Sequence, residues 1–162
     1  MRQLFLLLTL LALLATTALS VELAGRVLWV YDGDTLKIEN IGKVRLLGID
    51  TPESQPSSRD HFYTKRFSIT EKRLRKIAQQ AKYYNIHNLK DRRVRLELDQ
   101  THRDKYDRLL AYVYLPDGRM LNRILLQKGL ATVFRRYDFQ YKKDFLEAET
   151  KARNGKLGLW EE

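Results

Sequence analysis

Residues 32–53 have the sequence DGDTLKIENIGKVRLLGIDTPE, which predicts two β-strands joined by a tight turn. The stretches Thr35–Ile38 and Lys43–Ile49 are apolar and β-prone, and the residues between them form a turn sequence. In an antiparallel pair, the start of the first strand and the end of the second lie side by side. We therefore expect Asp34 and Asp50 to meet at one end of this hairpin.

The rest of the chain predicts an α+β fold. Further strands are expected at Leu23–Tyr31, Arg93–Asp99 and Leu109–Leu115. Apolar residues at helical spacing predict about three helices, at Leu74–Ala81 behind the N-cap Thr70, at Leu121–Leu125 before the stop residue Gly129, and at Phe145–Ala152. The polar stretch Thr51–Ser68 predicts a long surface loop. Five short strands with attached helices favour a small five-stranded barrel, because closure removes exposed edges.

The first twenty residues have the features of a secretory signal. One basic residue, Arg2, precedes the apolar run Leu4–Ala15, which is too short for a membrane span of about 20 residues. Ala18-Leu19-Ser20 supplies the small residues of a cleavage site. We expect cleavage after Ser20, a single domain over 21–162, and a secreted or periplasmic protein. The alternative is an uncleaved N-terminal anchor.

Composition points to a polyanionic partner. The chain has 30 Lys plus Arg against 20 Asp plus Glu, a net charge of +10, and removal of Arg2 with the signal leaves +9. The absence of cysteine excludes disulfides, cysteine-ligated metal sites and thiol chemistry. A small, strongly basic, exported domain suits nucleic acid, an anionic cell surface or an acidic polysaccharide. Charge alone leaves these three open.

The carboxylates of the hairpin indicate a shared site only when they are considered together. Taken singly, an Asp-Gly pair is usually only a turn, and Asp and Pro often end a strand. Together, Asp34 and Asp50 could hold one cation, with Glu53 just beyond them. Arg45 lies five residues before Asp50 on the same strand and could face the same mouth. A cation, a free carboxylate and a guanidinium suit phosphodiester chemistry.

Three sequence blocks resemble the staphylococcal nuclease (thermonuclease) family. They are Asp32-Gly33-Asp34-Thr35, Val44-Arg45-Leu46-Leu47-Gly48-Ile49-Asp50-Thr51-Pro52-Glu53 and Asp104-Lys105-Tyr106-Asp107-Arg108. Weaker similarity continues through Gly118–Asn122, Gly129–Ala131 and Gly155–Trp160. The matches keep the family order from about Val27 to Trp160, which is nearly the whole mature chain.

The resemblance implies an OB-type barrel with helices and a Ca²⁺-dependent nuclease. It would make Asp34, Asp50 and the backbone carbonyl of Thr51 the calcium ligands, and Glu53 the general base. Arg45 and Arg108 would bind phosphate, and Lys105 and Tyr106 would lie along the substrate groove. The implied reaction is cleavage of DNA and RNA phosphodiesters that leaves 3′-phosphate ends.

The sequence departs from the family pattern in three places. Asp107 replaces a common glycine, although aspartate tolerates left-handed backbone. Arg135 stands where some members have a groove tyrosine, and we expect Phe134 or Tyr137 to substitute for it. The segment from Thr51 to the start of the first helix is longer than in the type enzyme of the family. The basic face of that helix, which includes Arg75, is expected to be solvent-exposed.

Two other function classes compete with the nuclease. A catalytically silent OB-type module would only bind single strands, and a basic adhesin would bind anionic surfaces. A pure binder has no need of three carboxylates that repel phosphate. The presence of Asp34, Arg45, Asp50, Glu53 and Arg108 together therefore favours the nuclease.

Overall fold

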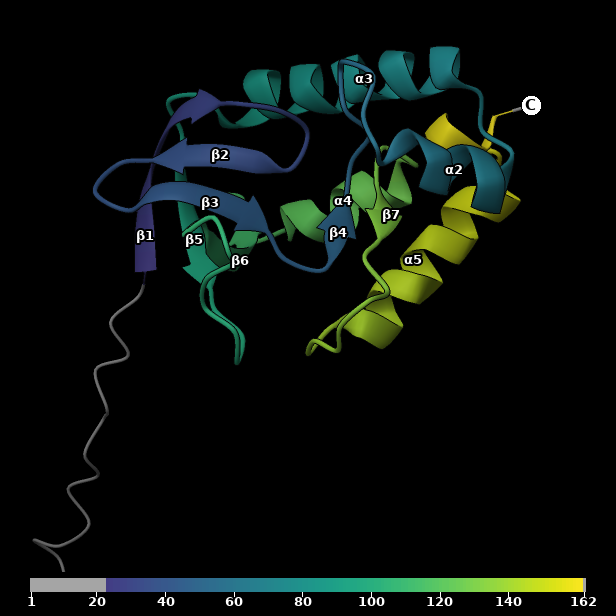
Figure 1. The fold of residues 1–162 in the computed structure, drawn as a ribbon. Helices are drawn as coiled ribbons and strands as arrows, with labels where there is room; N and C mark the ends of the chain where they lie inside the picture. The colour runs from purple at the N-terminus through teal and green to yellow at the C-terminus, as the bar shows by residue number, and fades with distance from the viewer. Residues whose placement is uncertain (1–22, 162) are drawn as a thin grey trace, which may run out of the picture.

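The computed structural model describes residues 23–161 and contains a closed barrel of five strands (Figure 1). The strand order around the barrel is β1-β2-β3-β6-β5, with β3 and β6 parallel and the other pairs antiparallel. The strands are β1 (Leu23–Val30), β2 (Thr35–Ile38), β3 (Gly42–Leu46), β5 (Arg93–Glu97) and β6 (Leu109–Tyr114). The predicted α+β barrel is thus confirmed. The predicted signal and its cleavage site lie outside the described residues.

The predicted third strand is divided in two. β3 ends at Leu46, and β4 (Ile49–Asp50) pairs instead with β7 (Thr132–Val133), a strand that sequence periodicity did not indicate. Gly48 makes the break, because its φ of 78° is a backbone conformation that favours glycine. A Cβ atom there would lie 2.7 Å from the ring of Phe139. The division carries the chain from the barrel into a second, two-stranded sheet.

Four α-helices are present in the described part of the chain, one more than expected. They are α2 (Asp60–Phe67), α3 (Glu71–Leu89), α4 (Leu121–Gln127) and α5 (Lys142–Asn154), followed by a short 3₁₀ helix, η1 (Gly158–Trp160). The hydroxyl of Thr70 caps α3 as predicted, 3.3 Å from the backbone nitrogen of Arg73. Helix α2 occupies part of the predicted surface loop, and its buried Tyr63 attaches it to the body of the protein.

The alternation of the hairpin decides which side chains face the core and which face away from it. Leu36 and Ile38 of β2, with Val44 and Leu46 of β3, are buried in the core. The intervening positions therefore point away from the core. Those positions carry Thr35, Lys37, Lys43 and Arg45. Within residues 23–161, no helix is both long and apolar enough to cross a membrane.

Candidate functional site

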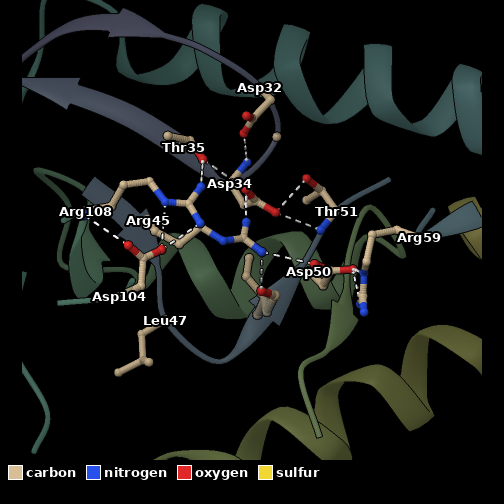
Figure 2. A network of polar contacts seen from close by, with 12 residues as sticks. Asp32, Asp34, Thr35, Arg45, Leu47, Asp50, Thr51, Arg59, Asp104 and Arg108 are labelled. Carbon is tan, nitrogen blue, oxygen red and sulfur yellow. Dashed lines mark hydrogen bonds and ion pairs between the residues drawn. The ribbon is translucent and has the colours of Figure 1, made fainter. Parts of the chain in front are cut away.

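Asp34 and Asp50 lie on either side of the Arg45 guanidinium (Figure 2). Nη1 of Arg45 forms an ion pair with Asp34, and Nη2 lies 3.0 Å from Oδ1 of Asp50. The strand register explains this, because Arg45 is directly opposite Thr35, the residue after Asp34. Burial lowers the pKa of Arg45, and Asp50 opposes that shift, so the guanidinium keeps its charge. The β2–β3 hairpin thus brings Asp34 to Arg45, and β4 brings Asp50 to the same guanidinium, so the three residues that the sequence singled out do meet.

Asp34 is held in place by the Asp-Thr-Pro-Glu block. Its Oδ2 accepts hydrogen bonds from the backbone nitrogen and the hydroxyl of Thr51, at 2.8 and 2.9 Å. The preceding Gly33 packs so closely on this block that a Cβ atom would lie 2.7 Å from the Thr51 hydroxyl. On its other side, the carbonyl of Gly33 accepts from Asn85 of α3 at 2.8 Å. The turn and the strand end therefore form one rigid unit.

Arg59 is a site residue that sequence reasoning missed. Its Nη2 lies 2.6 Å from Oδ2 of Asp50, and the hydroxyl of Tyr63 donates to the same oxygen at 2.8 Å. Its guanidinium lies 4.9 Å from the ring centre of Phe62. Burial alone would lower the pKa of Arg59, but attraction to Asp50 raises it. In the sequence, Arg59 is one arginine in a polar stretch, and only helix α2 brings it to the site.

Burial, together with the charge of Asp50, raises the pKa of Tyr63 well above its ordinary value. Its hydroxyl therefore keeps its proton and remains a donor. Asp50 is in this way bound by three donors, from Arg45, Arg59 and Tyr63. A carboxylate held by three donors keeps a fixed orientation.

Arg108 reaches the same network from the loop before β6. Its Nη1 lies 3.4 Å from the hydroxyl of Thr35, which donates to Asp34 at 3.2 Å. Asp104 anchors Arg108 through Nε at 2.8 Å. Burial alone would raise the pKa of Asp104, but the hydrogen bonds from Arg108 outweigh it and lower that pKa. Asp107 has a φ of 60°, so the turn that normally needs glycine is kept.

Lys105 and Tyr106 stand beside this arginine at the surface. Tyr106 is 67% exposed, with the Lys105 ammonium 4.9 Å and the Arg108 guanidinium 5.5 Å from its ring centre. Tyr137 is also exposed, and its ring centre lies 5.8 Å from that of Phe134. These three residues are available to substrate, and their roles stay predictions.

Arg135 does not face a groove. Its guanidinium forms an ion pair with Glu149, which is 1% exposed, and Nη1 donates to the carbonyl of Val133 at 3.0 Å. A charged carboxylate at that depth needs a partner. Arg135 therefore has a structural role, at the position where some family members have a groove tyrosine.

Glu53 is exposed beside the cluster, and its segment is fixed by Arg75. Partial loss of hydration beside the cluster raises the pKa of the Glu53 carboxyl group, as do Asp32 and Asp50, against a lowering by Arg45. Arg75 donates to the backbone carbonyl of Glu53 at 2.7 Å and pairs with Asp60 at 2.5 Å. The prediction that Arg75 lies on a solvent-exposed face was wrong, because the longer segment folds back over it.

The donor chemistry of the cluster suits a hard cation. In the part of the chain that is described, no three His, Cys, Asp or Glu side chains gather into a metal cluster. Two carboxylates, from Asp34 and Asp50, nevertheless converge on one positive group, and the backbone of Thr51 lies against the first of them. Carboxylate and carbonyl oxygens are the ligands that Ca²⁺ prefers. The residues present therefore fit such an ion.

Comparisons with known proteins show which family this chain resembles. A family model described as staphylococcal nuclease homologue matches residues 43–162. The thermonuclease of Staphylococcus intermedius is 36% identical over 137 residues, which cover 82% of this chain and 73% of that protein. The thermonuclease of Staphylococcus hyicus is 34% identical over 144 residues, with coverages of 86% and 76%. The endonuclease YncB of Bacillus subtilis is 37% identical over 136 residues, 80% of this chain and 57% of that protein.

Proposed function

This chain belongs to the staphylococcal nuclease family, and we propose that it is an exported, Ca²⁺-dependent nuclease that hydrolyses DNA and RNA. We also propose that its products carry 3′-phosphate ends. The observation that carries the proposal is the meeting of two guanidiniums, Arg45 and Arg108, on the short network of Asp34 and Thr35. That pair of planar, permanently charged groups suits a phosphodiester.

The two arginines bind and orient the scissile phosphate. Each guanidinium presents a fork of N–H donors that matches two phosphate oxygens. The side chains of Arg45 and Arg108 are 15% and 25% exposed, so a phosphate bound there is largely shielded from water. Shielding strengthens the interaction with the charge that grows on the phosphate oxygens in the transition state.

Glu53 takes the proton of the attacking water. Its raised pKa makes it a stronger base than an ordinary carboxylate. Positioned general bases contribute about 10²–10⁴ in rate. Arg75 fixes the backbone of Glu53 and thereby limits where its carboxylate can reach.

Asp34, Asp50 and the carbonyl of Thr51 would hold the cation. When bound, Ca²⁺ supplies Lewis-acid polarisation of a phosphoryl oxygen. A cation also removes an electrostatic obstacle, since two buried carboxylates beside a phosphate site otherwise repel the substrate.

Export is part of the proposal. It rests on the basic, apolar and small-residue succession of Met1–Ser20. We propose that cleavage after Ser20 releases the protein outside the cytoplasm. Mass spectrometry of the exported protein should find Val21 at the N-terminus, and a product that keeps Arg2 would support the anchor instead.

The activity is tested by incubating the exported protein with single-stranded DNA or with RNA, in Ca²⁺ or in excess chelator. We expect cleavage of both nucleic acids in Ca²⁺ alone, and fragments that become labelled at their 3′ ends only after phosphatase treatment. Asp34→Ala should abolish cleavage. Full activity in chelator would overturn the metal, and binding without cleavage under all divalent ions would establish the silent module.

A further inference from the structure

A β-bulge in β1 turns a tryptophan out of the barrel. Val27 pairs with Ile38, but the next paired residue is Trp29, opposite Lys37, so Leu28 is the extra residue. Strict alternation from the buried Val27 would bury Trp29. The bulge instead leaves Trp29 54% exposed and places Val30 in the core at 3%. Bulges re-aim side chains in this way, often near functional sites.

Two lysines extend the row that begins at Trp29. Lys37 of β2 pairs with Trp29, and Lys43 of β3 pairs with Lys37, so the three lie across adjacent strands at steps of about 4.8 Å. Neither lysine has a carboxylate partner within residues 23–161. The ammonium of Lys43 lies 4.9 Å from the ring centre of Tyr31. Like charges directly opposite each other destabilise a sheet, so this pair calls for an anionic partner.

The strands that carry Lys37 and Lys43 also lead to the candidate catalytic site. The pair Thr35 and Arg45 is two residues along the strands from the pair Lys37 and Lys43, on the same outward face (Figure 1 shows β1, β2 and β3 side by side). Two residues of strand correspond to about 7 Å. The backbone nitrogen of Tyr31 donates to the carbonyl of Thr35 at 3.0 Å, so the end of β1 borders the site as well.

We propose that Trp29, Tyr31, Lys37 and Lys43, here called the outer track, bind the single-stranded stretch of substrate that adjoins the scissile phosphate. Lys37 and Lys43 contact its phosphates, and the indole of Trp29 stacks on a base. This inference rests on the proposed nuclease function and extends it from one phosphate to several nucleotides. OB folds bind about 4–16 nucleotides by combining a basic surface with stacking aromatic residues.

The chemistry selects a single strand over a duplex. Stacking on Trp29 requires a base with a free face, and the bases of a duplex are already stacked on each other. Phosphate contacts alone would serve either form. The aromatic residue beside the two lysines is thus the feature that specifies the occupant.

Intrinsic fluorescence reports occupancy directly. The chain has two tryptophans, and Trp160→Phe leaves Trp29 as the only tryptophan, which can be excited selectively over tyrosine, while keeping a ring beside Phe67 and Arg153. In chelator, where we expect no cleavage, a single-stranded 12-mer should quench Trp29 strongly and a duplex of equal length weakly. Lys37→Gln with Lys43→Gln should raise the dissociation constant for the single strand about tenfold. Equal quenching by duplex, or none by either, would overturn the outer track.

Substrate length separates this inference from the nuclease itself. We expect Trp29→Ala, and the double lysine variant, to raise KM for a 12-mer about tenfold and to change KM for a dinucleotide far less. Tyr83→Ala removes a similarly exposed aromatic residue from α3, and Lys143→Gln with Lys151→Gln removes two charges from α5, so both serve as matched controls. Wild type that cleaves neither length overturns the proposed function. The outer track alone is overturned if the wild type cleaves both substrates while the Trp29 and double lysine variants change KM equally at the two lengths. It is also overturned if these variants change KM at neither length.

Discussion

Arg59 binds the oxygen of Asp50 that Arg45 does not use. Nη2 of Arg59 lies 2.6 Å from Oδ2, while Nη2 of Arg45 lies 3.0 Å from Oδ1. The segment that precedes α2 thereby fixes the side chain of Asp50 through Arg59. Under the proposed function Asp50 is a cation ligand, and Arg59 would act through that carboxylate without contacting the substrate.

Arg59→Met should therefore weaken the response to Ca²⁺. It removes the charge and keeps most of the stem, so Asp50 loses one of its three orienting donors. Outer partners of metal ligands typically contribute about 10–100-fold, and we expect the Ca²⁺ concentration for half-maximal cleavage to rise about tenfold. Arg66→Met, an exposed arginine on α2, is the matched control. A calcium titration unchanged in Arg59→Met would show that Arg45 and Tyr63 suffice.

Arg45→Lys and Arg108→Lys should each reduce kcat/KM by about 100-fold or more. Lysine keeps the charge but loses the forked donors, and lost transition-state donors cost about 10²–10³. Arg119→Lys is the control, because Arg119 also pairs with a nearby aspartate in a turn but lies at the opposite end of β6. Steady-state cleavage of a short oligonucleotide measures all three. Near-normal rates in both lysine variants would show that the two arginines contribute only their positive charge.

Glu53→Gln should slow turnover by about 10²–10⁴ and leave nucleic-acid binding in place. The amide is similar in size to the carboxylate but accepts no proton at neutral pH. Single-turnover cleavage in Ca²⁺ and oligonucleotide binding in chelator separate the two effects. A variant that cleaves like wild type would exclude Glu53 as the base.

Arg75→Lys should reduce activity several-fold with little change in melting temperature. Lysine has a single ammonium group for the contacts with the carbonyls of Glu53 and Gln55 and with Asp60, so the segment before α2 loses its fixed position. Arg73→Lys on the same helix is the control. Comparison of kcat with the melting temperature distinguishes this positioning role from loss of fold.

The loss of folding stability at acidic pH should depend on Asp99. Burial alone would raise the pKa of Asp99, but hydrogen bonds from the backbone of Gln140, at 2.8 Å, and the hydroxyl of Tyr112, at 2.7 Å, lower it. A depressed folded pKa gives stability that is present above the unfolded value and is lost as pH falls through the folded value. We expect Asp99→Asn to destabilise by about 1.5 kcal/mol at neutral pH. The difference should shrink below about pH 4, in urea unfolding across pH. A difference that persists at low pH would indicate lost packing.

The barrel could be predicted from sequence because its signals are local. The strands of residues 35–46 and the cap at Thr70 each depend on near neighbours, and both agree with the structure. The division at Gly48 and the strand Thr132–Val133 escaped prediction, since a two-residue pair has no period and exists only through contacts between distant segments. Helix α2 escaped because its polar composition hides the single buried anchor Tyr63.

The candidate site divides in the same way. Asp34 meets Arg45 through the pairing of β2 with β3, so that contact follows from the hairpin, whereas Asp50 reaches Arg45 from β4 after the break at Gly48. The contacts of Arg59 with Asp50 and of Arg75 with Glu53 depend on how a long polar segment folds back, which no periodicity specifies. The inward pairing of Arg135 with Glu149 needs a residue of α5 that lies fourteen positions further along the chain.

The parallel pairing of β3 with β6 gives this protein an activity that depends on complete folding. Arg45 lies in β3 and Arg108 immediately before β6, and the pairing of these two strands, in which Val44 lies opposite Leu109, closes the distance between them. Contacts so far apart along the chain form late, because the intervening segment must first lose its conformational freedom. In a nascent or unfolded chain Arg45 and Arg108 are therefore not yet together, and the proposed hydrolytic centre is assembled only when the barrel closes.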